Sequence, residues 1–160
     1  MNETVQQFHK YAHVKPEHLF QQVISSELFG EIKVARRKLV YFPKGIPGLQ
    51  EEKQFAFLDI EDYRPLTWMI STSGKYHFPV VQLSHLKAEN LDSLSQTHYL
   101  PLLNNLINSR PPCAVYVIVR LDPDVKQVSL KAPVIVSLHE HRGEQLILDS
   151  IEQSPHILVA

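Results

Sequence analysis

Histidines are the residues of this sequence most suited to chemistry, because the chain of 160 residues contains nine of them. Imidazole ligates metals and titrates near neutral pH. His139 and His141 flank Glu140 after a predicted strand. On a strand, residues two apart point to one face, but the segment also fits the hairpin that turns at Arg142-Gly143, where polar residues need no special reason. The two histidines would make half of a zinc site, but no spacing selects a third ligand from His85, His98 and His156. We therefore expect no metal and no cofactor, and a metal-dependent hydrolase that uses the histidines is the alternative function.

Other patterns typical of enzymes or of nucleic-acid-binding proteins are weak. Cys113 enters an apolar segment, as expected of a small buried hydrophobic residue rather than a nucleophile. The sequence contains no nucleophile elbow and no glycine-rich phosphate loop. The basic run Arg36-Arg37-Lys38 lacks interleaved aromatic residues, which favours a solvated turn over an RNA-binding strip. We expect no catalysis and no direct contact with nucleic acid.

Composition restricts the class of protein further. Hydrophobic residues make up 44% of the chain, charged residues make up 21%, and the formal net charge is -1. These values fit one folded domain and give no general attraction to nucleic acid or to an anionic membrane. No apolar run approaches the roughly 20 residues that cross a bilayer. The first residues are polar, unlike a secretory signal, and the single cysteine cannot form an internal disulfide. We expect a cytoplasmic protein without membrane contact.

The elements that must position these residues are mainly β-strands. Alternating or β-branched segments between Pro, Gly and Asp turns predict strands at 28–34, 39–42, 55–60, 66–70, 78–83, 113–119, 127–131, 134–138 and 145–148. Helical spacing from Leu91 to Ile107 predicts two short helices in the middle segment, since Pro101 interrupts a longer one. The pattern indicates a mainly β fold, either a sandwich or a small barrel. We expect an N-terminal extension over 1–22, one domain over 23–152 and a C-terminal tail over 153–160.

The most distinctive motif is a loop that follows the second predicted strand. Two prolines fix φ and two glycines permit positive φ, so the motif specifies one tight conformation. Its two large aliphatic residues, Ile46 and Leu49, either pack under the loop or offer a partner a hydrophobic contact. The motif comprises Phe42, Pro43, Lys44, Gly45, Ile46, Pro47, Gly48 and Leu49.

Several motifs in the same order resemble the FliW family of flagellar assembly factors. They cover 28–83 and 125–150, about half of the chain. The matching segments are Phe29-Gly30-Glu31-Ile32, Phe42-Pro43-Lys44-Gly45-Ile46-Pro47-Gly48, Glu51-Glu52-Lys53-Gln54-Phe55, Ser129-Leu130-Lys131-Ala132-Pro133-Val134-Ile135-Val136 and Arg142-Gly143-Glu144-Gln145-Leu146-Ile147-Leu148. Residues 84–112 and the N-terminal extension are less like the family.

The resemblance implies a small antiparallel barrel-like fold, no enzymatic activity and two protein partners. Members of the family bind newly made flagellin in the cytoplasm. They also bind CsrA, an RNA-binding translational repressor, and relieve its block on flagellin mRNA. Flagellin and CsrA therefore compete for the factor. A further alternative is that the fold persists with a changed protein partner, recruited by residues 84–112 and the N-terminal extension.

Two segments are the candidate contact sites for such partners. One is the motif from Phe42 to Leu49. The other is the strand around Ala132 and Pro133, since Pro133 cannot donate to a sheet and so marks an edge or a bulge. An acidic cluster around the third predicted strand is either an ordinary solvated rim or a surface for a basic partner. It comprises Glu51, Glu52, Asp59, Glu61 and Asp62.

Overall fold

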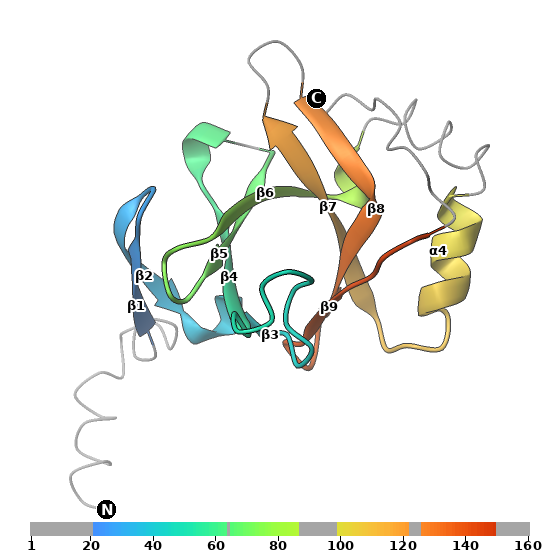
Figure 1. Cartoon of the computed structure of the whole chain (residues 1–160), viewed down its shortest axis with the longest axis horizontal. Helices are drawn as coiled ribbons and strands as arrows, with labels where there is room; N and C mark the ends of the chain where they lie inside the picture. Colours follow the sequence, from blue (N-terminus) through green and yellow to red (C-terminus); the bar gives the residue numbers. More distant parts are fainter. Residues whose placement is uncertain (1–20, 64, 87–98, 122–125, 150–160) are drawn as a thin grey trace, which may run out of the picture.

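The computed structural model describes residues 21–63, 65–86, 99–121 and 126–149. Seven strands form one antiparallel sheet in which each strand pairs with the next one along the chain (Figure 1). They are β3 (Leu39–Tyr41), β4 (Gln54–Asp59), β5 (Thr67–Ser71), β6 (His77–Gln82), β7 (Cys113–Leu121), β8 (Lys126–Ser137) and β9 (Gly143–Gln145). A separate two-stranded sheet consists of β1 (Gln21–Ser26) and β2 (Gly30–Ala35).

Helices are short in the part of the chain that the structure describes. The α-helix is α4 (Tyr99–Ile107), and the 3-10 helices are η1 (Arg36–Lys38), η2 (Glu61–Tyr63) and η3 (Leu83–His85). Pro101 lies in the first turn of α4, where its missing N–H costs no intrahelical bond. No helix of these residues has the length and apolar character needed to span a membrane.

The seven-stranded sheet curls into a barrel that its two outermost strands nearly close. The N–H of Tyr41, the last residue of β3, donates to the carbonyl of His141, which precedes β9, at 2.9 Å. Tyr41 also forms an isolated parallel bridge with Arg142. Figure 1 looks along the barrel, with β3 beside β9. The structure therefore confirms the expected antiparallel, barrel-like fold.

Large apolar side chains fill the inside of the barrel. Successive residues of a strand point to opposite faces, so alternate positions supply this core. The ring of Phe42 lies 5.4 Å from that of Phe55 and 6.4 Å from that of Phe57, between centroids. The inner core, as we call this cluster, comprises Val40, Phe42, Ile46, Phe55, Phe57, Met69, Val80, Val134 and Val136.

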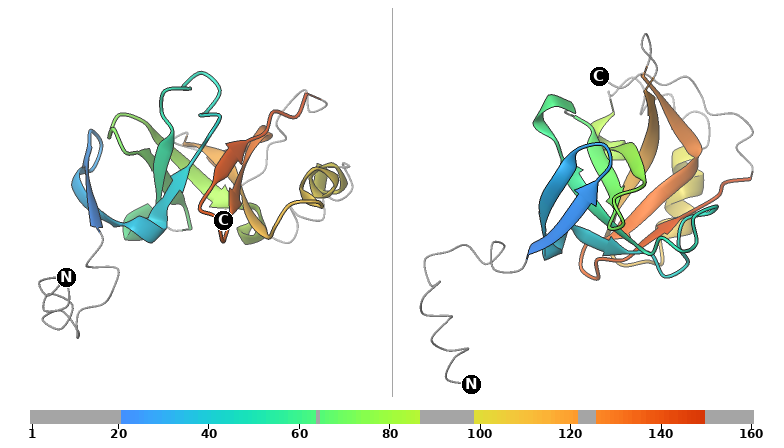
Figure 2. Two further views of the ribbon diagram at one scale, coloured as in Figure 1. Left: turned by 90° about the horizontal axis from the view of Figure 1, so that it is seen from below. Right: turned by 60° about the vertical axis from the view of Figure 1, so that its left-hand side comes forward.

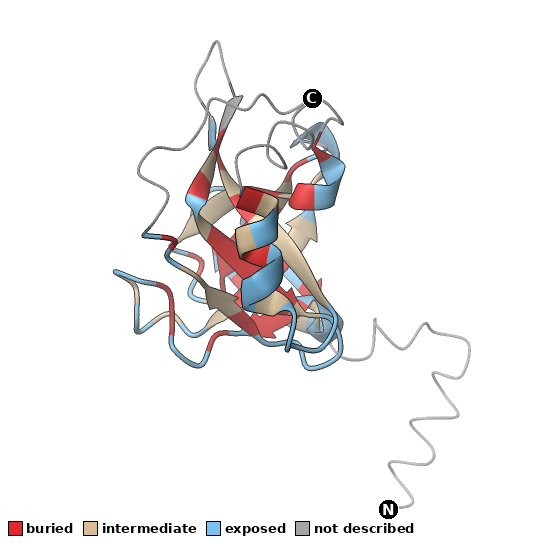
Figure 3. Cartoon of the chain, turned by 90° about the vertical axis from the view of Figure 1, so that its right-hand side faces the viewer, coloured by how far each residue is buried: buried red, intermediate tan, exposed pale blue. Residues whose placement is uncertain are grey.

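Two further cores cover opposite sides of the barrel. The β1–β2 hairpin packs on the outside of β4 and β5, with Ile24 and Val34 against Trp68 and Ile70; its place beside the barrel is visible in Figure 2. Helix α4 covers the outside of β7 and β8 through Tyr99 and other buried residues. Figure 3 looks onto that side and shows buried, intermediate and exposed residues on α4.

Most of the strands agree with the sequence predictions, and three elements differ. β1 was not predicted, because QQVISS shows no alternation of apolar and polar residues. The two strands expected at 127–131 and 134–138 are one strand, β8. The last strand ends at Gln145 instead of beginning there. The expected helix before Pro101, most of the N-terminal extension and the C-terminal tail lie outside the described residues.

Candidate functional site

The loop from Phe42 to Lys53, which joins β3 to β4, contains two consecutive tight turns. The N–H of Gly45 donates to the carbonyl of Phe42 at 2.9 Å, and that of Leu49 donates to the carbonyl of Ile46 at 2.7 Å. The second turn has Pro47 and Gly48 at its centre, with Gly48 at φ 86°, as in a type II turn. The prolines and glycines of the motif therefore encode the fixed loop that the sequence predicted.

Gly45 is required by both its backbone angle and its surroundings. Its φ is 68°, in the left-handed region that favours glycine. A Cβ at this position would lie 2.7 Å from the Cα of Gln50, so a larger residue would push the two sides of the loop apart. The Lys53 Nζ donates to the carbonyl of Pro43 at 3.0 Å across the same loop.

The apolar residues of the loop pack beneath it. Ile46 is only 6% exposed and belongs to the inner core, and Leu49 is half-buried against the same core. The outward face of the loop is formed by Pro43, Lys44, Pro47 and Gly48, which are exposed. Of the two alternatives for Ile46 and Leu49, the structure therefore supports packing under the loop.

A hollow of about 210 Å³ lies beneath this loop at one end of the barrel. Pro47 lines it from the loop, Val134 from β8 and Gln145 from β9. The Gln145 amide also donates from Nε2 to the carbonyl of Ala132 at 3.1 Å. The two segments selected from the sequence, the loop and the Ala132-Pro133 dipeptide, therefore meet at the same end of the barrel. The remaining lining residues are Ile46, Leu49, Met69, Phe78 and Ile118.

Sequence reasoning did not select the residues that complete this hollow. Phe78 and Ile118 are neither on the loop nor near Ala132 and Pro133 in the sequence. Successive side chains of a strand point to opposite faces, so their alternation along β6 and β7 predicts that Phe78 and Ile118 lie on the inner face of the sheet. That signal identifies the inner face of a strand but does not reveal which end of the barrel is hollow.

Pro133 lies in a bulge rather than at an open edge. Tyr116 of β7 pairs with Val134, whereas Ile118 pairs with Ser129, so β8 carries extra residues between these pairs. The carbonyl of Pro133 accepts the N–H of Leu146 at 2.9 Å on the other side of the strand. Of the two options for Pro133, the bulge is therefore confirmed, and no open strand edge at this dipeptide is available for peptide docking.

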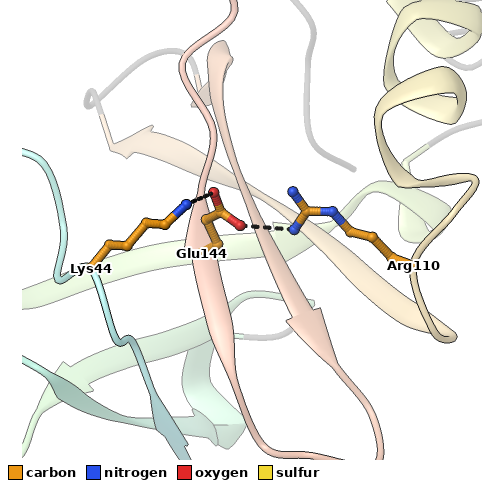
Figure 4. Close-up of polar contacts among 3 residues, drawn as sticks. All are labelled: Lys44, Arg110 and Glu144. Atoms are coloured by element: carbon orange, nitrogen blue, oxygen red, sulfur yellow. Dashed lines mark hydrogen bonds and ion pairs between the residues drawn. The ribbon is translucent and has the colours of Figure 1, made fainter.

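Glu144 of β9 links the loop to the segment that follows α4. Its carboxylate accepts from Lys44 Nζ at 3.1 Å and from Arg110 Nη1 at 2.8 Å, and Figure 4 shows it between the two cations. Partial burial alone would raise the pKa of Glu144, but the hydrogen bonds and charges of Arg110 and Lys44 outweigh it and hold the pKa below its usual value. The two cations therefore favour the ionised form of Glu144, and their contacts join the loop to β9.

The histidine pair lies in the hairpin connection between β8 and β9. His139 and Glu140 lie in a turn and His141 follows it, so the three belong to the hairpin connection before Gly143 and do not share a strand face. His141 has φ 53°, which turns the chain toward β9. In the described part of the chain, no three His, Cys, Asp or Glu residues gather as a possible metal site. His98 and His156 lie outside that part.

The acidic residues around β4 do not form one patch. Glu51 and Glu52 precede the strand, whereas Glu61 and Asp62 follow it in η2. Six residues of extended strand separate the two groups by about 20 Å. Glu52 also accepts a hydrogen bond from Ser73 Oγ at 2.9 Å. Of the two alternatives for these residues, the structure therefore does not support a single acidic surface for a basic partner.

Comparison with known proteins identifies the family. A family model described as FliW protein matches residues 22–157. The flagellar assembly factor FliW of Caldicellulosiruptor bescii is 33% identical over 133 residues, which are 81% of this chain and 84% of the relative. That of Carboxydothermus hydrogenoformans is 31% identical over 128 residues, 78% of this chain and 81% of the relative.

The fold agrees with a solved structure from the same family. A crystal structure of the flagellar assembly factor FliW matches with a TM-score of 0.57 and 26% identity. The match covers 87% of this chain and 95% of that chain. Because the family model spans most of the sequence and the fold agrees as well, this chain belongs to the FliW family of flagellar assembly factors.

Proposed function

We propose that this chain is a cytoplasmic binding protein that sequesters flagellin in the manner of a chaperone and has no catalytic activity of its own. Membership of the FliW family supports a role in flagellar assembly. By exchange of partners it would also antagonise the translational regulator CsrA, because a factor occupied by flagellin is not available to CsrA.

The observation that carries the proposal is the fixed loop over the hollow at one end of the barrel. Two turns hold the loop, and Glu144 holds Lys44 from the side. A preformed surface loses little entropy when it binds a partner. Pro47 is exposed on the loop and also lines the hollow, so a partner side chain that enters the hollow would touch it. We therefore place the flagellin contact at Pro47 and its neighbours.

Flagellin would present a hydrophobic element to this surface. The hollow is lined mainly by aliphatic and aromatic side chains, with Gln145 as the polar group among the described residues that line it. Apolar side chains with one polar group are typical of sites that bind a large aliphatic residue with defined orientation. The Lys44 side chain is 79% exposed. It would contact polar groups of flagellin next to the aliphatic residue that enters the hollow.

A pull-down from native cell extract tests the proposal. The tagged full chain serves as bait, and mass spectrometry identifies flagellin and CsrA among the captured proteins. Ile46 is too buried for this test, since a polar substitution there would disturb the inner core. Pro47→Glu instead adds a charge on the exposed loop, and Asn105→Glu adds the same side chain on the exposed face of α4.

We expect wild type and Asn105→Glu to capture flagellin and Pro47→Glu to lose it. Added flagellin should release CsrA from the bait. Loss with Asn105→Glu alone would place the flagellin contact on α4 instead of the loop, whereas a wild-type bait that captures another protein and no flagellin would favour the changed-partner alternative. Absence of flagellin from a folded wild-type bait would contradict the proposal.

A further inference from the structure

The barrel has a second hollow, of about 330 Å³, at the end opposite the loop. β3 runs from η1 to the loop. Arg37 and Lys38 of η1 line this hollow, whereas the loop covers the other one. Asp59, the last residue of β4, and Thr67, the first residue of β5, also line it. The two hollows therefore lie at the two ends of one barrel, and only the first is covered by the Phe42–Lys53 loop.

Apolar side chains form the floor of this second hollow. Val40 and Val136 are buried members of the inner core, and the rings of Phe57 and Tyr116 lie with centroids 5.1 Å apart. The Tyr116 hydroxyl oxygen accepts from Gln82 Nε2 at 3.1 Å, which fixes the ring at the boundary between apolar floor and polar rim. A flat apolar group would find aromatic and aliphatic contacts on this floor.

The rim of the hollow carries several side chains that can donate hydrogen bonds to an anion, and few acids. Lys38, His85 and His141 line it from three separate segments, η1, η3 and the turn before β9, and Arg37 lies beside Lys38. Among the described residues that line the hollow, Asp59 is the sole acid. Its Oδ1 accepts a hydrogen bond from Thr67 Oγ1 at 2.8 Å, so this carboxylate already has a partner.

We infer that this open end of the barrel binds a small organic anion. A carboxylate or phosphate group would lie at the rim and accept hydrogen bonds from Lys38 and His141, and a flat apolar body would lie on Phe57 and Tyr116. A hollow of about 330 Å³ is at the small end of the range for ligand sites, which suits a compact ligand. The site is separate from the flagellin surface proposed above, so either can fail without the other.

Nuclear magnetic resonance titration of the full chain tests the inference with defined probes. Phenyl phosphate and benzoate carry an anionic group on a flat apolar ring, and benzyl alcohol is the neutral comparison. Lys38→Gln removes the ammonium from the rim, and His141→Asn removes the imidazole with a residue that tolerates positive φ. Lys75→Gln is the matched control, because Lys75 is an exposed lysine in the β5–β6 turn, away from the described residues that line this hollow.

The expected result is saturable shifts of Phe57, Tyr116 and Val136 with at least one anionic probe and weaker binding of benzyl alcohol. Tighter binding of phenyl phosphate assigns a phosphate ligand, and tighter binding of benzoate a carboxylate. Lys38→Gln and His141→Asn should each weaken binding about tenfold, as expected for loss of one charge-assisted hydrogen bond. Absence of saturable shifts, equal binding of benzyl alcohol, or equal loss in Lys75→Gln would overturn the inference.

Discussion

Gly143, the first residue of β9, lies directly against the ring of Phe42, the first residue of the loop. A Cβ at Gly143 would lie 2.5 Å from the Cζ of Phe42 and 2.6 Å from its Cε2. The ring is completely buried and packs between Phe55 and Phe57, so it has little room to move. The start of the loop motif and the start of the last strand are therefore joined by a contact that only glycine allows.

Gly143→Ala should destabilise the fold by about 1–3 kcal/mol, the usual cost of overpacking a filled core. Phe42→Leu makes room for the added methyl group, so the double variant should cost less than the sum of the two single ones. Urea unfolding of the four proteins gives the comparison. If Gly143→Ala leaves the free energy of unfolding unchanged, or if the losses of the two single variants simply add in the double variant, the Phe42 ring adjusts freely and the contact does not require glycine.

Glu144 should stabilise the fold above its unfolded pKa and lose that contribution in acid. Its pKa in the folded chain is lowered from 4.5, so the stabilisation is present above about pH 4.5 and disappears as the pH falls through the lower folded value. The carboxylate is 28% exposed, so solvent reduces the effect. Arg110→Met and Glu144→Gln should both flatten the acid limb of a plot of unfolding free energy against pH. An unchanged limb in Glu144→Gln would refute this role.

His77 should make the fold less stable below neutral pH. Burial lowers its pKa from 6.5, although Glu27 and a hydrogen bond with the Lys75 backbone act in the opposite direction. Its Nε2 lies 2.6 Å from Ser26 Oγ, which joins β1 to β6. Since the folded pKa is the lower one, stability is full above about pH 6.5 and falls as the pH drops toward the folded pKa.

His77→Gln provides the control for this pH dependence, because it cannot titrate but keeps a hydrogen-bonding group near Ser26. Thermal unfolding from pH 5 to pH 8 should show a smaller loss of melting temperature for His77→Gln than for wild type. Equal losses in the two proteins would show that other groups cause the acid sensitivity.

Tyr99→Phe should leave the fold as stable as wild type or stabilise it by up to about 1 kcal/mol. The Tyr99 side chain is 1% exposed where α4 packs on the barrel, and its hydroxyl has no hydrogen-bond partner among the described residues. Burial also raises its pKa far above the usual value. Tyr99→Leu is the matched variant that removes ring packing and should cost more. A loss of more than about 1 kcal/mol in Tyr99→Phe would indicate that the hydroxyl has a partner.

The strands and the loop could be predicted because their signals are local. Pro47 and Gly48 specify a type II turn whatever surrounds them. Alternation along β4 likewise identifies Phe55 and Phe57 as residues of one face. These two kinds of signal were sufficient to predict the mainly β fold and the loop that covers the candidate site.

The remaining features depend on long-range geometry that local patterns do not contain. Glu144 meets Lys44 across 100 residues of sequence and Arg110 across 34. Pro133 indicated a bulge in β8 as one option. Where the bulge lies and how many extra residues it contains depend on the pairing of β8 with β7. β1 has no pattern of its own and is a strand because it pairs with β2 over the barrel surface. For the same reason, neither hollow could be placed from the sequence.

Calorimetric titration of the full chain with monomeric flagellin tests the central claim most directly. Wild type and Asn105→Glu should bind flagellin saturably with the same affinity, and Pro47→Glu should bind at least about tenfold more weakly, since a charge would be buried at the contact. Circular dichroism must first show that all three proteins are folded. Equal affinity for Pro47→Glu and wild type, or no binding by wild type, would contradict the claim that the loop-covered end of the barrel holds flagellin.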